Sequence, residues 1–129
     1  KMPEAQGMYL SFAGLSTDLL LANDPKGAGA KFVSSYKKAY GKDPVGSYPL
    51  YGVAAVQVIL AAIAKSNGTR KSVTQAVFSG SGISIPAKQS VLGKELKIST
   101  LSGDTLAKDI TIEVIKGNEE TTVKAWTVK

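Results

Sequence analysis

One helix-forming segment constrains this chain more than any other feature. Residues 49–64 predict a helix with apolar or small side chains on every side, and Gln57 is its only strongly polar residue. A helix that is apolar all round is normally buried all round. We therefore expect sheet and further helices to enclose it, which is a large demand on a chain of 129 residues.

The segment is short for a membrane span. Its helical part would rise roughly 24 Å at 1.5 Å per residue, whereas the hydrocarbon core of a bilayer is about 30 Å thick. Pro49 suits the first turn of a helix, and Asn67-Gly68 is a natural stop. A buried helix of a folded domain is therefore preferred over a membrane span.

The composition limits the chemistry that is available. The chain contains no cysteine and no histidine, which removes thiol chemistry, Cys/His zinc sites and imidazole bases. Carboxylates and lysines remain, so a hydrolase that uses carboxylates stays open, but without a motif to support it. The sequence has no phosphate-binding loop, dinucleotide fingerprint or carboxylate cluster with metal spacing. We expect no enzyme, no catalytic residues, no cofactor and no metal.

The net charge of +6 raises the question of a nucleic-acid partner. Of the sixteen basic residues only Arg70 is an arginine, and Lys37-Lys38 and Arg70-Lys71 are the only adjacent basic pairs. Arginine is preferred where phosphate and guanine are recognised, and a binding footprint needs clustered charge. We expect a solvated basic surface and no nucleic-acid partner.

The first part of the chain predicts one strand, a short helical turn and three helices, over residues 7–13, 18–22, 27–40, 49–64 and 73–78. Gly41 is a natural C-cap for the second of these helical segments. Thr69 or Ser72 can cap the last one.

The second part of the chain predicts strands over residues 83–85, 91–98, 109–115 and 121–128. Gly117-Asn118 forms the turn of a C-terminal β-hairpin with Trp126 on one face. One early strand and several late ones leave the helices without enough parallel strands to pack on. We therefore expect an incomplete α/β or α+β set, which indicates a fragment.

The order of these elements carries a family resemblance. It rests, in chain order, on Gly7-Met8-Tyr9-Leu10; Phe32, Tyr36, Tyr40-Gly41 and Pro44; Tyr48, Tyr51, Ala54-Ala55-Val56 and Ala61-Ala62-Ile63; Val91-Leu92-Gly93; Gly103-Asp104; and Ile110 to Gly117. Together they resemble the C-terminal third of type I periplasmic solute-binding proteins, the branched-chain amino acid receptors of ABC transporters. The ordered set is fairly specific, although no single motif in it is diagnostic.

The resemblance implies two α/β lobes joined by three hinge crossings, with the ligand closed between the lobes. This chain would be an incomplete piece of that fold, with three helices, about four to five strands and a C-terminal β-hairpin. Residues 1–13 would end the second lobe and enter the hinge. Residues 14–105 would form the C-terminal part of the first lobe, and residues 106–129 would return to the second. The acidic residue that pairs with a ligand ammonium in the family would lie upstream.

Three residues are candidates for ligand contact. Tyr48 falls where the family can place an aromatic residue over the ligand side chain, and the alternative is a hinge or core tyrosine. Tyr51 lies on the same helical face, where core packing is favoured. Ser16 lies near a hinge crossing, where a strand or cap role is favoured. Glu119-Glu120 is expected to be solvated.

The resemblance implies an extracytoplasmic solute-binding component of an ABC importer, periplasmic or membrane-anchored, that captures a small amino acid or amide-like ligand by hinge closure. Its partners would be this ligand and the ABC permease subunits. The fragment alone would expose apolar surface and self-associate. The alternative is a small self-contained basic interaction domain that contacts an anionic surface or nucleic acid.

Overall fold

The structure, a computed structural model, describes residues 3–127. In chain order its elements are η1 (Pro3–Ala5), β1 (Tyr9–Phe12), α1 (Thr17–Asn23), α2 (Ala28–Tyr40), α3 (Tyr48–Ala64), α4 (Arg70–Phe78), β2 (Ser84–Ile85), β3 (Leu96–Lys97), β4 (Asp109–Lys116) and β5 (Glu119–Thr127). The predicted mixed α/β class is confirmed. The described range holds four α-helices rather than three, because the short turn expected near residue 18 is a helix.

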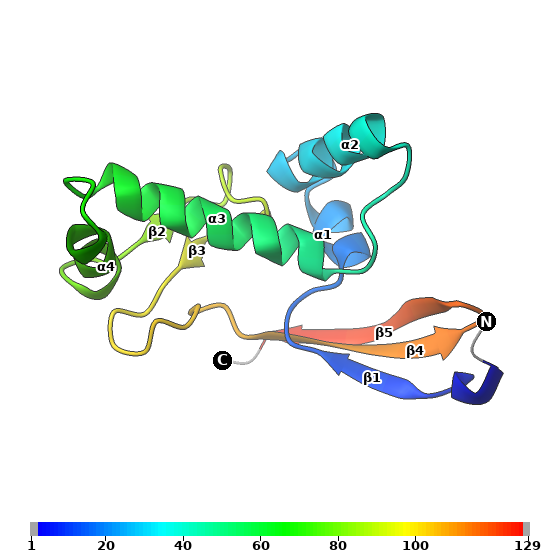
Figure 1. The fold of residues 1–129 in the computed structure, drawn as a ribbon. Helices are drawn as coiled ribbons and strands as arrows, with labels where there is room; N and C mark the ends of the chain where they lie inside the picture. Colours follow the sequence, from blue (N-terminus) through cyan, green and yellow to red (C-terminus); the bar gives the residue numbers. More distant parts are fainter. Residues whose placement is uncertain (1–2, 128–129) are drawn as a thin grey trace.

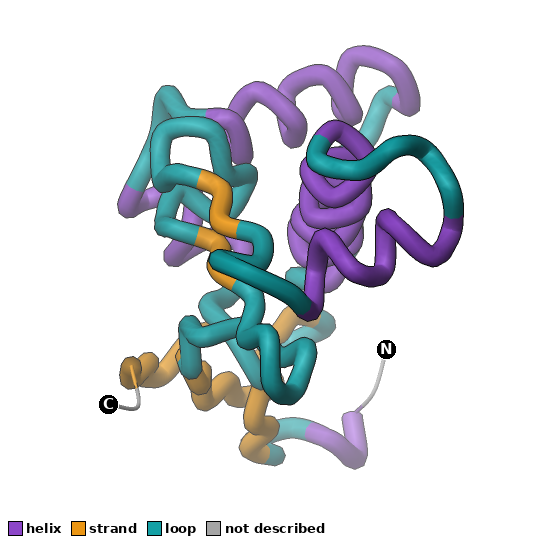
Figure 2. Tube along the Cα trace, turned by 90° about the vertical axis from the view of Figure 1, so that its left-hand side faces the viewer, coloured by secondary structure: helices purple, strands orange, loops and turns teal. Residues whose placement is uncertain are grey.

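The elements form two parts that lie one above the other (Figure 1). The helical part holds α1 to α4 and the short β2–β3 pair, and the sheet part is an antiparallel sheet in the order β1-β4-β5. Figure 2, turned by 90°, shows these strands gathered below the helices. The chain passes from the sheet to the helices after β1 and returns before β4, so two connections join the parts.

The sheet joins the two ends of the described chain. β1 pairs with β4 so that Phe12 lies opposite Thr111, and β4 pairs with β5 across the two-residue turn Gly117–Asn118. The predicted C-terminal hairpin is therefore confirmed. A bulge between Ile112 and Glu113 shifts its register. Val128, the last residue of the predicted strand, lies outside the described residues, as do residues 1, 2 and 129 of the predicted lobe segments.

The hydrophobic core lies in the helical part, on one side of α3. Its buried members are Leu15, Leu20, Leu50, Ala54, Ala62, Ile83, Ile85, Val91, Leu92, Leu96 and Ile98. They come from α3, from the region around α1 and from the segment that carries β2 and β3. Phe32 and Val33 of α2 pack against this cluster as partly buried side chains.

The other side of α3 is not covered. Val56, Ile59, Leu60 and Ile63 are each between 45% and 59% exposed. The expectation that this helix is buried on every side is wrong for the described chain, because β2 and β3 have two residues each and cover only one side. An apolar surface of this kind typically packs against further protein. Within residues 3–127, no helix has the length and apolar character needed to cross a membrane.

The predicted helix ends are confirmed at two places. Gly41 adopts the left-handed conformation, with φ of +70°, and its N–H donates to the Lys37 carbonyl at the end of α2. The Thr69 hydroxyl accepts a hydrogen bond from the Ser72 N–H at the start of α4. These contacts satisfy backbone groups that a helix end leaves without partners.

The strand predicted over residues 91–98 is wrong in its first half. Residues 91–94 form turns and bends, and only Leu96–Lys97 pairs with Ser84–Ile85. Gly93 has φ of +65°, which interrupts an extended strand. Val91 and Leu92 are nevertheless buried, so their apolar character reflects core packing in a turn.

Candidate ligand-binding cleft

A cavity of about 660 Å³ lies between the helical part and the sheet. We call it the cleft. Its walls come from the end of β1, from α1, from the loop before α3 and from one side of the β4–β5 hairpin; the lining residues are Phe12, Ser16, Thr17, Asp18, Leu21, Val33, residues 43–48, Glu113, Ile115, residues 118–120 and Thr122. Its volume is within the range of small-molecule sites, roughly 300–1,000 Å³.

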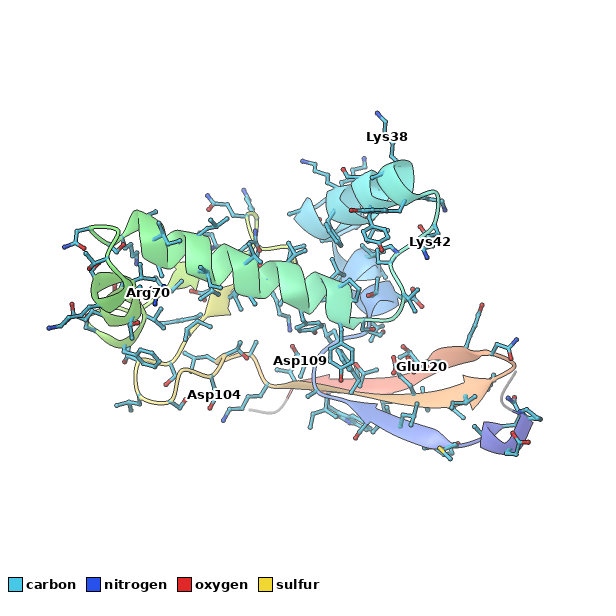
Figure 3. All side chains as sticks on the ribbon, in the orientation of Figure 1. Lys38, Lys42, Arg70, Asp104, Asp109 and Glu120 are labelled. Atoms are coloured by element: carbon cyan, nitrogen blue, oxygen red, sulfur yellow. The ribbon has the colours of Figure 1, made fainter. Side chains whose placement is uncertain are left out.

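The charged side chains that line the cleft are all acidic. They are Asp18, Asp43, Glu113, Glu119 and Glu120. Asp43 forms an ion pair with Lys37 at 3.0 Å, whereas the other four have no ion pair within residues 3–127. In Figure 3, Glu120 lies on the sheet, whereas Lys38 points away from it on α2. The cleft is therefore a negative region in a chain of net charge +6.

Glu113 is the buried member of this group. It lies on the central strand β4, opposite Leu10 of β1 and Thr122 of β5, and it is only 6% exposed. Among the described residues, none forms a hydrogen bond or ion pair with its side chain. Burial raises the pKa of the Glu113 carboxyl, and the negative charges of Glu120 and Asp18 raise it further. Among the described residues no fully enclosed side-chain oxygen lacks a hydrogen-bond partner, so the unpaired Glu113 carboxylate opens onto the cleft, where a cation can reach it.

Tyr48 supplies an aromatic surface at the edge of the cleft. It is the first residue of α3 and is 75% exposed. Its ring meets that of Phe12, at the end of β1, edge to face with centroids 5.1 Å apart. Phe12 is buried, so this pair connects the helical part to the sheet. Ligand contact by Tyr48 stays a prediction, and its exposure leaves the ring accessible.

Ser16 lines the cleft but its hydroxyl already has a partner. It is 4% exposed, and its Oγ lies 2.8 Å from Oγ1 of Thr122 on β5. Ser16 is the N-cap residue of α1 and its carbonyl accepts from the Leu20 N–H, but its side chain makes no capping hydrogen bond. Next to it, the Thr17 N–H donates to Ser47 Oγ at 3.1 Å. These bonds fix the wall of the cleft where three segments meet.

Tyr51 lies outside the cleft, at the connection that follows β1. Its hydroxyl accepts a hydrogen bond from the Leu15 N–H at 2.7 Å and donates one to the Leu15 carbonyl at 3.1 Å. Burial raises the pKa of Tyr51, against the hydrogen bond to Leu15, which lowers it. A Cβ on Gly14, whose φ is +146°, would lie 2.4 Å from this hydroxyl. Tyr51 therefore holds the connection in place, while ligand contact by Tyr51 stays a prediction.

A second cavity of about 760 Å³ lies along α3 on the far side of this connection. Its lining is mostly apolar and includes Ala55, Val58 and Ile59. At its edge Asp109 is bonded to both Lys94 and Thr127, and Figure 3 shows Asp109 where the sheet meets the start of α3. Ile59 lines this cavity and also belongs to the exposed apolar side of α3. An apolar surface of this kind suits packing by further protein better than recognition of a polar ligand.

Glu113 is the site residue that sequence reasoning missed. In the alternating segment 109–115, the apolar Ile110, Ile112 and Val114 would normally indicate the buried side. Here the polar side is buried too: Asp109, Thr111 and Glu113 are 8%, 0% and 6% exposed, whereas Ile110 is 39% exposed. The strand pattern alone carries no signal that its polar side is buried. Glu119 and Glu120 are exposed as predicted, but their position at the cleft was also missed.

The cleft lacks the donor arrangement of a metal site. Within residues 3–127, no three acidic side chains lie close enough together to hold a metal ion. Besides its carboxylates, the cleft is lined by hydroxyl groups and aromatic rings.

No protein-family model matches the chain, and no curated protein matches it. Among solved structures, a leucine-binding protein from Thermotoga maritima is similar, with a TM-score of 0.65 and 19% sequence identity. The chain has the fold of part of a leucine-binding protein. The similarity covers 95% of this chain and 31% of that one, so this chain spans about a third of the length of its structural neighbour.

This similarity confirms the fold that the resemblance implied, an incomplete piece of a type I periplasmic-binding-protein fold. At 19% identity it establishes the architecture, and the ligand has to be argued from the cleft itself.

Proposed function

We propose that this chain is part of the solute-binding component of an ABC importer, which captures a small amino acid or amide-like ligand. The observation that carries the proposal is the cleft between the helical part and the sheet, in a chain with the fold of part of a leucine-binding protein. Side chains from both parts line this cleft. A ligand that touches both walls would favour their closure.

In this proposal residues 14–105 belong to the first lobe, and residues 1–13 and 106–129 belong to the second. The contacts around Gly14 support a hinge there. The Thr111 hydroxyl donates to the Gly14 carbonyl at 2.6 Å, and Tyr51 holds the next residue, Leu15, by two hydrogen bonds. Closure would then occur by changes in a few backbone dihedral angles at the connections while both parts keep their packing.

Tyr48 would be the aromatic residue that covers the ligand. Its ring is accessible, it begins α3 in the helical part, and its neighbour Phe12 lies on the sheet. Ser16 would shape the wall through its bond to Thr122 and offer its remaining hydrogen-bonding capacity to the ligand. Tyr51 would act at the hinge rather than on the ligand.

The rest of the binding protein would lie in further chain. The exposed apolar side of α3 supports this, because strands of a complete first lobe would cover Val56, Ile59, Leu60 and Ile63. The whole protein would work outside the cytoplasm, either free in the periplasm or anchored to the membrane. Permease subunits would receive the closed form, and no catalytic step is needed.

Isothermal titration calorimetry tests this proposal on the full-length protein that contains the chain. The panel is a set of amino acids and their amides. We expect saturable one-site binding of at least one class, with affinity reduced about tenfold in Tyr48→Ala because the aromatic ring that would cover the ligand is lost. The control is Tyr40→Ala, since Tyr40 is also exposed but does not line the cleft. Absence of binding to every member of the panel would contradict the proposal.

A further inference from the structure

We propose that the cleft recognises a positively charged nitrogen of a small organic ligand, and that Glu113 is the carboxylate that meets it. This inference deepens the proposed function and rests on it. The resemblance places the family's acidic partner of a ligand ammonium upstream of this chain, so Glu113 would be a further carboxylate at the cleft; the inference comes from the burial, the contacts and the charges found there.

The first argument is the state of Glu113. Its side chain is 6% exposed, lines the cleft and has no hydrogen bond or ion pair with any residue from 3 to 127. Two other buried polar side chains nearby have hydrogen bonds: Ser16 bonds to Thr122, and Thr111 donates to the Gly14 carbonyl. The Glu113 carboxylate opens onto the cleft, because no fully enclosed side-chain oxygen among residues 3–127 lacks a hydrogen-bond partner. A ligand cation in the cleft would supply the missing partner.

The second argument is the sign of the charge around Glu113. Asp18 on α1 and Glu120 on β5 both face it closely enough to affect its ionisation. No lysine or arginine lines the cleft, although the chain has sixteen of them. These carboxylates would repel an anionic group that entered the cleft. They would attract a cation, because no basic side chain of the protein lines the cleft to neutralise their charge.

The third argument distinguishes an organic cation from a metal ion. A metal ion needs several oxygen ligands at short range, and no cluster of three acidic side chains with that geometry occurs within residues 3–127. An ammonium or guanidinium group needs only one or two carboxylates, and its hydrocarbon part can pack on aromatic rings. Tyr48 and Phe12 offer such rings at the same cleft. The cavity of about 660 Å³ is also far larger than a single ion requires.

The charged nitrogen can come from two sources, the α-ammonium group of an amino acid or a cationic side chain. Two ligand pairs separate them in calorimetric titrations of the full-length protein. Leucine and 4-methyl-2-hydroxypentanoate differ at the α-position, and lysine and norleucine differ at the end of the side chain. Each pair is titrated into the unaltered protein, Glu113→Gln, Glu120→Gln and the control Glu4→Gln, which lies in η1 away from the cleft.

We expect the charged member of at least one pair to bind more tightly by about tenfold or more, as for a desolvated charge pair. Glu113→Gln should remove this preference, Glu120→Gln should reduce it, and Glu4→Gln should leave it unchanged. If Glu113→Gln does not fold, judged by circular dichroism, Glu120→Gln carries the test. An equal preference in the unaltered protein and in the cleft variants would overturn the role of Glu113 while leaving the proposed function intact. Failure of all four ligands and the wider amino-acid panel to bind would overturn both.

Discussion

Replacing Tyr51 by phenylalanine tests whether this residue holds the connection between the two parts. The substitution keeps the ring, which lies 5.4 Å from that of Phe12 between centroids. It removes the hydroxyl that bonds to both the N–H and the carbonyl of Leu15. Leu15 is 9% exposed, so water has limited access to the two backbone groups that would lose their partner.

The size of the effect follows from these two hydrogen bonds. Each contributes about 0.5–1.5 kcal/mol net, so Tyr51→Phe should lower the free energy of unfolding by about 2 kcal/mol. With a urea dependence of about 2 kcal/mol per molar for a chain of this size, the midpoint of urea unfolding should fall by about 1 M. Circular dichroism and Trp126 fluorescence can both follow the transition.

Tyr48→Phe is the matched control. Its ring packs against the same Phe12 at 5.1 Å, but Tyr48 is 75% exposed and none of the hydrogen bonds among residues 3–127 involves its hydroxyl. The control should therefore change the midpoint by less than about 0.3 M, as for an ordinary surface substitution. Equal midpoints for Tyr51→Phe and Tyr48→Phe would refute the structural role assigned to the Tyr51 hydroxyl.

Three further outcomes follow from other contacts. Gly14→Ala should destabilise the chain by about 3 kcal/mol in urea unfolding, because its Cβ would lie 2.4 Å from the bonded Tyr51 hydroxyl and its φ is +146°; a change below about 0.5 kcal/mol would contradict this. Burial raises the pKa of Glu113 above its unfolded value of about 4.3. Ionised Glu113 therefore destabilises the fold at pH values above its folded-state pKa, and this destabilisation disappears at pH values well below its unfolded-state pKa. Glu113→Gln should therefore raise the melting temperature at pH 7, with the gain lost below about pH 4, and an equal gain at both pH values would exclude this cause. The 129-residue chain alone should self-associate in sedimentation velocity, and Leu60→Lys on the uncovered side of α3 should reduce this association; a monomer at all concentrations would favour a self-contained domain.

Much of the fold could be predicted because its signals are local. The helical period and the Gly41 cap predicted α2 nearly to the residue. The end of α4 was predicted at Phe78, while its start was left open between two caps, of which the structure uses Thr69. Gly117-Asn118 predicted the hairpin turn. The strand expected over residues 91–98 failed because apolar character cannot distinguish a core turn from a strand. The burial of α3 failed for a different reason, since covering it depends on partners that the described residues do not supply.

The candidate site could be predicted only in part. Tyr48 and Ser16 both lie at the cleft. They could be predicted because they stand at the ends of elements whose order in the chain is visible in the sequence. The bond of Ser16 to Thr122 joins residues 106 positions apart, and no local pattern contains it. Glu113 looks like a solvent-facing residue of an alternating strand. Only the packing of the helical part over the sheet turns that polar side into the wall of a cleft.

Hydrogen–deuterium exchange of the full-length protein, with and without its best calorimetric ligand, tests most directly whether this cleft is the binding site. The account predicts slower exchange on ligand binding in residues 43–48 and 113–122, which form opposite walls of the cleft. Exchange in residues 54–59 of α3, which border the second cavity, should stay the same. Protection of residues 54–59 with no change in the cleft segments would contradict the account.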